Sequence, residues 1–338
     1  TTSHTSKSPE RHDSMVNTMS ATTPRATGAS GEVAIRTRGL TKQYGERLAV
    51  NTLNLEVYRG DIFGFLGPNG AGKTTTIRMM LHLITPTSGS VEVLGHDIAT
   101  DSGEVLPRVG ALVETPALYL YMSGRDNLRA VGSVLGGVPE SRIDEVLELV
   151  RLKGRERDKV KTYSLGMKQR LGVAMALLQD PDVLVLDEPA NGLDPAGIVE
   201  MRDLLRTLAA AGKTIFISSH VLTEVRQICT RVAILDQGRL VTETTIEELV
   251  KGHGEFAVQL EPAHIREALA LVRAQPWGHD ARMDEQGMLI TAAPDGHGRD
   301  LNLFLIHAGF APETLAPQAQ DLEQIFLRLT NSNSGDAQ

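Results

Sequence analysis

Hydrophobic positions in the first two thirds of the chain form short blocks that alternate between strand-like and helical spacing. Continuous runs at Ile62–Leu66, Val183–Leu186 and Thr214–Ile217 have the length of buried strands. Apolar residues recur at helical spacing in Thr74–Leu83 and in Ile198–Ala210. Because strands alternate with helices, the pattern predicts an α/β fold with a mainly parallel, covered core sheet.

Other segments extend this picture before residue 240. Strands are expected at Val33–Thr37 and Leu53–Val57. The stretch from about Gly124 to Leu178 is predicted to be mostly helical and to lie in a helical subdomain at about 115–180. Within it, Ser141 and Asp144 have the spacing of a capping pair at a helix start.

After a turn signal at Asp236–Gly238 the pattern changes, and Thr245–Lys251 is predicted to be a short capped helix. Short strands and helices then alternate in a weaker pattern. The expected elements are strands at Phe256–Leu260 and Met288–Thr291 and helices at Ile265–Arg273, Leu301–Ala308 and Leu322–Leu329. We therefore expect a small α+β domain at 251–332.

The two ends of the chain differ from the rest. Residues 1–31 are rich in Ser and Thr and contain few large apolar side chains, so we expect a disordered tail there and a disordered end at 333–338. The main domain is then expected at 32–250.

Composition restricts the class of protein. The 338 residues are 41% hydrophobic and 22% charged, which excludes wholesale disorder. A net charge of −8 argues against a nucleic-acid partner, and the single cysteine, Cys229, excludes an internal disulfide. No apolar stretch approaches the roughly 18 residues of a membrane-spanning helix. We therefore expect a protein that is soluble by itself and reaches a membrane only through a partner.

The strand at Ile62–Leu66 ends in a glycine-rich loop with P-loop spacing. Its residues are Gly67, Pro68, Asn69, Gly70, Ala71, Gly72, Lys73 and Thr74, with Thr75 next. Glycines let backbone amides approach phosphates, Lys73 adds charge for the β- and γ-phosphates, and the Thr74 hydroxyl can ligate Mg²⁺. The strand before the loop and the helix after it are the required context, so we predict an ATP site that includes Thr75.

A second acidic element follows the strand Val183–Leu186. Asp187 at the strand end can hold Mg²⁺ through water, and Glu188 can polarise an attacking water. Apolar strands that end in Asp are common, so this motif is weak by itself. Its position downstream of the P-loop favours a nucleotide-hydrolysing enzyme.

With these motifs the chain resembles the ATP-binding subunit of an ABC transporter, from about Val33 to Val241. Taken singly, Tyr44 and His220 would be ordinary loop or cap residues; their place in the order of motifs distinguishes them. Besides the P-loop and the acidic strand end, Tyr163–Arg170 is similar to the family's signature and Asn191–Asp194 is similar to its D-loop. Ser218–His220 is similar to its switch-histidine element. Tyr44 stands where the family keeps an aromatic residue that stacks on adenine.

The resemblance implies that two copies close head to tail around two ATP molecules. Ser164 and Gly166 of one copy would bind the γ-phosphate of ATP on the other copy's P-loop. His220 would contact the γ-phosphate, Glu188 would orient water, and Asp194 would link the two sites. ATP binding and hydrolysis would then drive a separate transmembrane permease, at the cytoplasmic face of the cell membrane.

Two departures from the family pattern concern the same site. Glu114 stands where the family has glutamine; a carboxylate can still ligate Mg²⁺ or water, but it adds negative charge beside a triphosphate. The signature has Leu165 and Met167 where glycine and glutamine are commonest. These features, with Gly192–Pro195 and the closing segment Leu322–Thr330, resemble exporters of the bacitracin, lantibiotic and daunorubicin resistance type. The implied cargo is a drug, an antibiotic or another lipophilic or peptide compound.

Residues Ala117–Met122 are unusually apolar for a loop. They either pack inside the helical subdomain or face a groove that receives a short helix of the transmembrane subunit.

Two other functions stay open. A soluble ABC-type ATPase acting on ribosomes or DNA would usually carry two ATPase halves or a long coiled coil, and the chain shows one set of motifs. An ATP-dependent interaction module without transport is the second alternative, because Glu114 is unusual.

Overall fold

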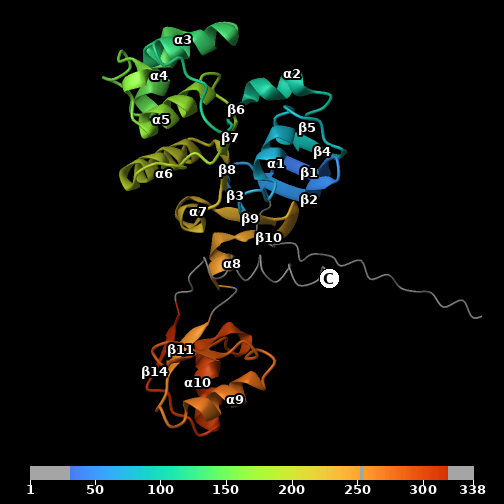
Figure 1. Cartoon of the computed structure of the whole chain (residues 1–338), viewed down its shortest axis with the longest axis vertical. Coiled ribbons are helices and arrows are strands. Elements are labelled where there is room, and N and C mark those ends of the chain that lie inside the picture. The colour runs from blue at the N-terminus through green and yellow to red at the C-terminus, as the bar shows by residue number, and fades with distance from the viewer. Residues whose placement is uncertain (1–30, 252–254, 319–338) are drawn as a thin grey trace, which may run out of the picture.

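A six-stranded sheet forms the centre of the computed structural model, which describes residues 31–251 and 255–318 (Figure 1). Its order is β10-β9-β3-β8-β7-β6, with every pair parallel except β10 and β9. The strands are β3 (Ile62–Leu66), β6 (Val109–Leu112), β7 (Val183–Asp187), β8 (Thr214–Ser219), β9 (Arg231–Asp236) and β10 (Arg239–Thr245). Every residue of β3, β7 and β8 is buried, which confirms the expected parallel, covered sheet.

A second, antiparallel sheet covers one face of the first. Its order is β2-β1-β4-β5, with strands β1 (Val33–Tyr44), β2 (Arg47–Tyr58), β4 (Ser88–Val93) and β5 (His96–Asp97). The two strands predicted in this region are parts of the twelve-residue β1 and β2. Phe63, Phe65 and Phe216 of the parallel sheet share one core with Leu53 of this sheet and with helix α1 (Lys73–Met80).

Helices cover the other face. Helices α6 (Pro195–Ala210) and α7 (Leu222–Ile228) share a core with the parallel sheet, and that core continues into a helical group drawn in green at the top of Figure 1. The group contains α3 (Gly124–Val134), α4 (Glu140–Leu149) and α5 (Leu165–Ala176), as expected for a mostly helical stretch. The 3-10 segment η2 (Val160–Thr162) belongs to this group, whereas α2 (Ser102–Val105), which the 3-10 segment η1 (Leu106–Arg108) follows, contributes Val105 to the core of the antiparallel sheet.

The predicted capping pair at Ser141 and Asp144 is wrong. Helix α4 begins at Glu140, one residue before Ser141, and its N-cap is Pro139, which provides no side-chain hydrogen bond. The carbonyl oxygen of Pro139 accepts from Ile143 N at 3.2 Å, so the first helical hydrogen bond is made before the serine. Asp144 instead pairs with Arg125 of α3.

The short helix predicted after residue 245 is confirmed as α8 (Ile246–Lys251). Glu248 N donates to Thr245 Oγ1 at 3.1 Å, and Thr245 N donates to Glu248 Oε2 at 3.3 Å. This reciprocal pair is a capping box, which explains why the strand β10 passes directly into a helix.

The C-terminal elements, drawn orange to red in Figure 1, form an α+β unit with its own core. Its sheet has the order β12-β13-β11-β14. The elements are β11 (Phe256–Gln259), α9 (Ile265–Arg273), β12 (Arg282–Met283), β13 (Leu289–Thr291), the 3-10 segment η3 (Pro294–Gly296), α10 (Gly298–His307) and β14 (Thr314–Pro317). The predictions for the tail up to residue 30, the helix at Leu322–Leu329 and the end at 333–338 lie outside the described residues.

Among the described helices, none is long and apolar enough to cross a membrane.

A buried cluster of charges lies at the β9–β10 pair. The Arg231 guanidinium pairs with Asp61 and with Glu243, and it stacks over the ring of Tyr58 at 4.7 Å from the centroid. Burial raises the pKa of Glu243 to about 6, although the charge of Arg231 opposes the rise. The folded protein therefore binds a proton at Glu243 more tightly than the unfolded chain does.

We predict that stability falls as this carboxyl ionises. Between about pH 4.5 and 6 the folded state holds more protons at Glu243 than the unfolded state, so the free energy of unfolding decreases by roughly 1 to 2 kcal/mol as the pH rises. Glu243→Gln should flatten that part of the pH profile, measured by urea unfolding followed by circular dichroism. The exposed Glu46→Gln serves as the control, and an unchanged slope in the Glu243 variant would contradict the prediction.

Candidate nucleotide-binding site

The P-loop runs from the end of β3 to the start of α1, and packing explains its glycines. A Cβ on Gly67 would lie 2.5 Å from the carbonyl oxygen of Leu235, and one on Gly72 would lie 2.4 Å from that of Ala49. Gly72 also has φ +105°, which side chains rarely adopt. The loop can therefore lie this close to β2 and β9 only with glycine at both positions.

Lys73, the first residue of α1, folds back over the loop. Its Nζ donates to the carbonyl oxygens of Gly67 at 2.7 Å and Pro68 at 3.3 Å, and it lies 3.3 Å from Glu188 Oε1. The side chain is almost fully buried. A buried ammonium group shared between two carbonyls and a carboxylate is well placed to move onto a phosphate.

Thr74 and Asp187 meet across the sheet. Thr74 Oγ1 donates to Asp187 Oδ2 at 2.9 Å, although the two residues are 113 positions apart. The other carboxylate oxygen of Asp187 accepts a hydrogen bond from Ser218 Oγ at the end of β8. A hydroxyl and a carboxylate side by side supply the hard oxygen atoms that Mg²⁺ prefers.

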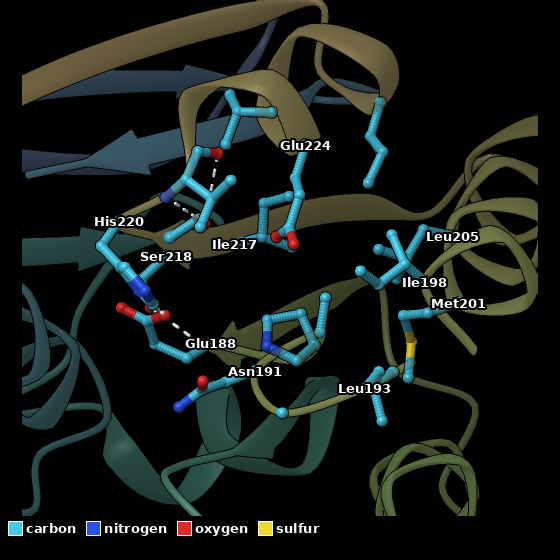
Figure 2. Close-up of a pocket in the computed structure, with 17 residues that line it drawn as sticks. Glu188, Asn191, Leu193, Ile198, Met201, Leu205, Ile217, Ser218, His220 and Glu224 are labelled. Carbon is cyan, nitrogen blue, oxygen red and sulfur yellow. Dashed lines mark hydrogen bonds and ion pairs between the residues drawn. The ribbon is translucent and has the colours of Figure 1, made fainter. Parts of the chain in front are cut away.

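Glu188 and His220 form a dyad at the end of the sheet. His220 Nδ1 lies 2.6 Å from Glu188 Oε2, and Figure 2 shows the two side chains pointing toward one another. Glu188 has φ +51°, an uncommon conformation for a residue other than glycine, which costs of order 1–3 kcal/mol. Its amide donates to Ser218 O at 3.2 Å and to Ser218 Oγ at 3.0 Å, so β8 holds this strained backbone in place.

A small pocket of about 130 Å³ lies beside the dyad. Apolar side chains of α6 and α7 line much of it, and the carboxylate of Glu224 also faces it (Figure 2). Burial raises the pKa of Glu224, and nearby His220 opposes the rise. The dyad thus has this mainly apolar pocket on one side and a larger, more polar cleft on the other.

The larger cleft, of about 910 Å³, opens over the P-loop and brings most of the predicted site residues together. Those that line it are Tyr44, Asn69, Gly70, Gly72, Lys73, Thr74, Thr75, Glu114, Asp187, Glu188 and His220. Gly67, Pro68 and Ala71 belong to the same loop but do not line the cleft. The exposed ring of Tyr44 stands at the edge, with Lys42 Nζ at 5.1 Å from its centroid.

Glu114 lines the cleft and forms an ion pair with an arginine. Its Oε1 accepts from Arg78 Nη2 at 2.6 Å, and Arg78 lies on α1 just after the P-loop. The positive charge of Arg78 offsets the negative charge that Glu114 adds beside a triphosphate. Glu114 also has φ +60°, so its backbone is held in an unusual conformation. Its assignment as a metal ligand stays a prediction.

Ser164, Gly166 and Asp194 do not line this cleft. Ser164 is the N-cap of α5, where its Oγ accepts from Met167 N at 3.2 Å. Asp194 is the N-cap of α6, where its Oδ1 accepts from Gly197 N at 3.0 Å. Both side chains are exposed. Within one chain these residues are therefore not part of the cleft wall, although Leu165 and Gly192 beside them are.

Comparison with known proteins identifies the family. Residues 50–191 match the family model described as ABC transporter. The chain is 41% identical over 296 residues to the bacitracin transport ATP-binding protein BcrA of Bacillus licheniformis, and the match covers 87% of this chain and 96% of that protein. The chain belongs to the ABC transporter ATP-binding proteins. It therefore binds ATP, and its enzymatic activity is ATP hydrolysis.

Two further matches agree with this family. The chain is 35% identical over 311 residues to the daunorubicin resistance ATP-binding protein DrrA3 of Streptomyces coeruleorubidus, over 89% of this chain and 97% of that protein. A solved ATP-binding subunit of an ABC transporter has a TM-score of 0.58 and 27% identity, over 65% of this chain and 92% of that one. The ABC resemblance and the fold class inferred from the sequence are confirmed.

The site of this ABC protein fits Mg²⁺ only in part. Thr74 and Asp187 offer adjacent oxygens, whereas the described residues contain no group of three or more His, Cys, Asp or Glu that could hold a metal ion. Mg²⁺ commonly takes one or two protein oxygens and completes its octahedron with phosphates and water. The arrangement suits a cation that arrives with a nucleotide.

Ser218 is a residue whose role the motifs did not indicate. Its Oγ contacts both acids of the site, donating to Asp187 and accepting from the Glu188 amide. Only the pairing of β8 between β3 and β7 reveals this position. The neighbouring Ser219 has an Oγ that bonds to the Val221 backbone and to the Glu224 side chain, and to neither Asp187 nor Glu188 in any hydrogen bond of the described residues.

We predict that Ser218→Ala lowers the ATPase turnover number about tenfold to a hundredfold, because Asp187 and Glu188 lose the group that orients them. Ser219→Ala, the matched control, should keep turnover within about threefold. Steady-state phosphate release of the purified full chain measures both. Equal turnover of the Ser218 variant and wild type would show that the Ser218 hydroxyl does not orient the two acids for catalysis.

Proposed function

We propose that this ATPase drives a separate transmembrane permease and exports a drug, an antibiotic or another lipophilic or peptide compound. The observation that carries the enzymatic part is the cleft in which Lys73, Thr74, Asp187, Glu188 and His220 converge. The export role is supported by the similarity, over nearly their whole length, to proteins named for bacitracin transport and daunorubicin resistance. The proposed place of action is the cytoplasmic face of the cell membrane.

Each side chain then has a role in hydrolysis. The P-loop amides and Lys73 bind the phosphates, Tyr44 stacks on adenine, and Thr74 and Asp187 hold Mg²⁺, which neutralises phosphate charge when bound. Glu188 orients the attacking water, and His220 holds the Glu188 carboxylate and contacts the γ-phosphate. When a triphosphate draws Lys73 away, Glu188 loses its ion pair and is freed to act on water.

The active form is proposed to be a head-to-tail dimer. Ser164 caps α5 with its side chain exposed, and an exposed helix N-terminus favours an anion. Ser164 and Gly166 would bind ATP on the second copy, and the exposed Asp194 would contact it at the D-loop. None of the three residues lines the cleft of its own chain, which is consistent with this arrangement.

The apolar loop before α3 supports a permease contact. Tyr119 is 62% exposed and Tyr121 is 78% exposed, whereas the neighbouring Leu118 packs against the core. An apolar groove of about 410 Å³ lies near it, between the edge strand β6, helix α3 and helix α5, with Ala117 in its wall. Exposure of both rings favours the groove interpretation over packing inside the subdomain, and a short permease helix is the proposed occupant.

We also propose the domain division expected from the sequence. The ATPase domain comprises 32–250, with its helical subdomain at about 115–180, and the accessory domain comprises 251–332. The separate core around Val258, Leu289 and Leu301 supports the second unit.

Replacement of the proposed base tests the enzymatic mechanism. Glu188→Gln should keep ATP binding, lower hydrolysis about a hundredfold or more and trap a dimer with ATP, because the amide cannot take a proton from water. Phosphate release and light scattering with and without ATP measure this, with the exposed Glu104→Gln as the control. Wild-type turnover in the Glu188 variant would overturn the assignment of the base.

Removal of the exposed rings tests the permease contact. Tyr119→Ala combined with Tyr121→Ala should lower permease-dependent ATPase stimulation about tenfold or more while leaving ATP affinity unchanged, because aromatic anchors dominate interfaces. The measurement compares the purified chain with and without its membrane partner in vesicles. Leu83→Ala, an exposed leucine elsewhere, is the control. Full stimulation in the double variant would show that the permease contact lies elsewhere, whereas no stimulation of wild type would favour a soluble ATPase.

A further inference from the structure

One face of helix α5 contacts the nucleotide side of its own chain. Leu165, Gln169 and Gly172 are spaced by four and three residues, so they lie on the same face of the helix. Leu165 and Gln169 line the ATP cleft. Gly172 packs so tightly that a Cβ there would lie 2.8 Å from Pro116 Cβ. The helix that carries the signature motif therefore also forms part of the wall of its own ATP site.

Gln169 is the unusual residue of this face. Its side chain is 4% exposed, yet its Oε1 has no hydrogen-bond partner among the residues that the structure describes. An unsatisfied buried carbonyl costs about 1–3 kcal/mol, so such an oxygen usually has a partner that is a ligand or a water. This oxygen belongs to a side chain that lines the cleft.

The surrounding groups show what kind of partner is missing. Glu114, which lines the same cleft, accepts hydrogen bonds and is already tied to Arg78. Phosphate oxygens also accept, so a triphosphate cannot bond to Gln169 Oε1 directly. A water molecule can donate to the amide oxygen and to a phosphate at once.

The contacts of α5 determine where Gln169 lies along the cleft. A Cβ on Gly192 would lie 3.1 Å from Leu165 Cδ2, and Gly192 follows Glu188 closely in the chain. Gly172 touches Pro116, two residues after Glu114. Gln169 lies between these two contacts on the helix, which puts it between the segment that follows Glu188 and the segment that follows Glu114.

We propose that Gln169 is a positioning residue for ATP, and this inference rests on the proposed function of the cleft. Because Oε1 is closed off from solvent in this structure, the side chain first turns into the cleft, and its Oε1 then accepts a hydrogen bond from a water molecule that enters with the nucleotide and its cation. Gln169 thereby supplies the amide that is absent at position 114. Because Ser164 caps the same helix, the bond also links ATP in one cleft to the helix N-terminus offered to the second copy.

The test uses Gln169→Leu and Gln169→Met in the full chain, so that the result does not depend on one variant folding. Removal of an unsatisfied acceptor should leave the melting temperature without nucleotide equal to or above that of wild type. Affinity for Mg-ATP should fall about tenfold, because a hydrogen bond made only in the complex is lost. Affinity for ADP should change less than about threefold, since ADP lacks the γ-phosphate next to Glu188.

Calorimetric titration measures both affinities, and Gln179→Leu, an exposed glutamine just after α5, is the matched control. A lower melting temperature with equal losses for ATP and ADP would show a purely structural role and overturn the inference. Unchanged Mg-ATP affinity in both variants would also overturn it. Failure of wild type to bind Mg-ATP would instead overturn the proposed function, so the two failures are distinguishable.

Discussion

Hydrogen bonds between the ends of three neighbouring parallel strands hold the whole ATP site together. Strand β8 lies between β3, which leads into the P-loop, and β7, which ends in Asp187. Ser218 at the end of β8 bonds to Asp187 and to the amide of Glu188, and Thr74 reaches Asp187 from the P-loop side. Because parallel strands end at the same edge, groups more than a hundred residues apart are brought within hydrogen-bond distance.

The electrostatic balance of the site depends on helix α1. Two acids at the cleft, Glu188 and Glu114, have positive φ and therefore lie on strained backbone. Each is matched by a cation of the same short helix, Lys73 and Arg78 respectively. One helix thus points its N-terminal end at the proposed phosphate site and sets its cations against both carboxylates. These positive charges reduce the repulsion between the two acids and a bound triphosphate.

Helix α5 connects this site to the rest of the proposed machine. Its N-cap Ser164 is exposed for a second copy, its inner face lines the ATP cleft through Gln169, and Gly172 packs on the loop that leads to the apolar segment with Tyr119 and Tyr121. A small displacement of α5 would therefore move the signature residues and the wall of the proposed permease groove at the same time. Close packing of Gly172 against the Pro116 ring favours movement of the helix and the loop as one body.

The sequence by itself determined the parallel sheet, the P-loop and the acidic strand end, because buried strands and phosphate loops require residue types that local spacing reveals. It missed the extent of β1 and β2, whose shifts of register interrupt the alternation of apolar residues, and it misplaced the start of α4, whose N-cap is Pro139 and not Ser141. The contacts of Ser218, Arg78 and Gln169 came only from the tertiary structure, although Ser218 and Gln169 lie in segments that the motifs had marked. Their partners are distant in the chain, and which side chains meet depends on strand order and helix packing, which no local pattern records.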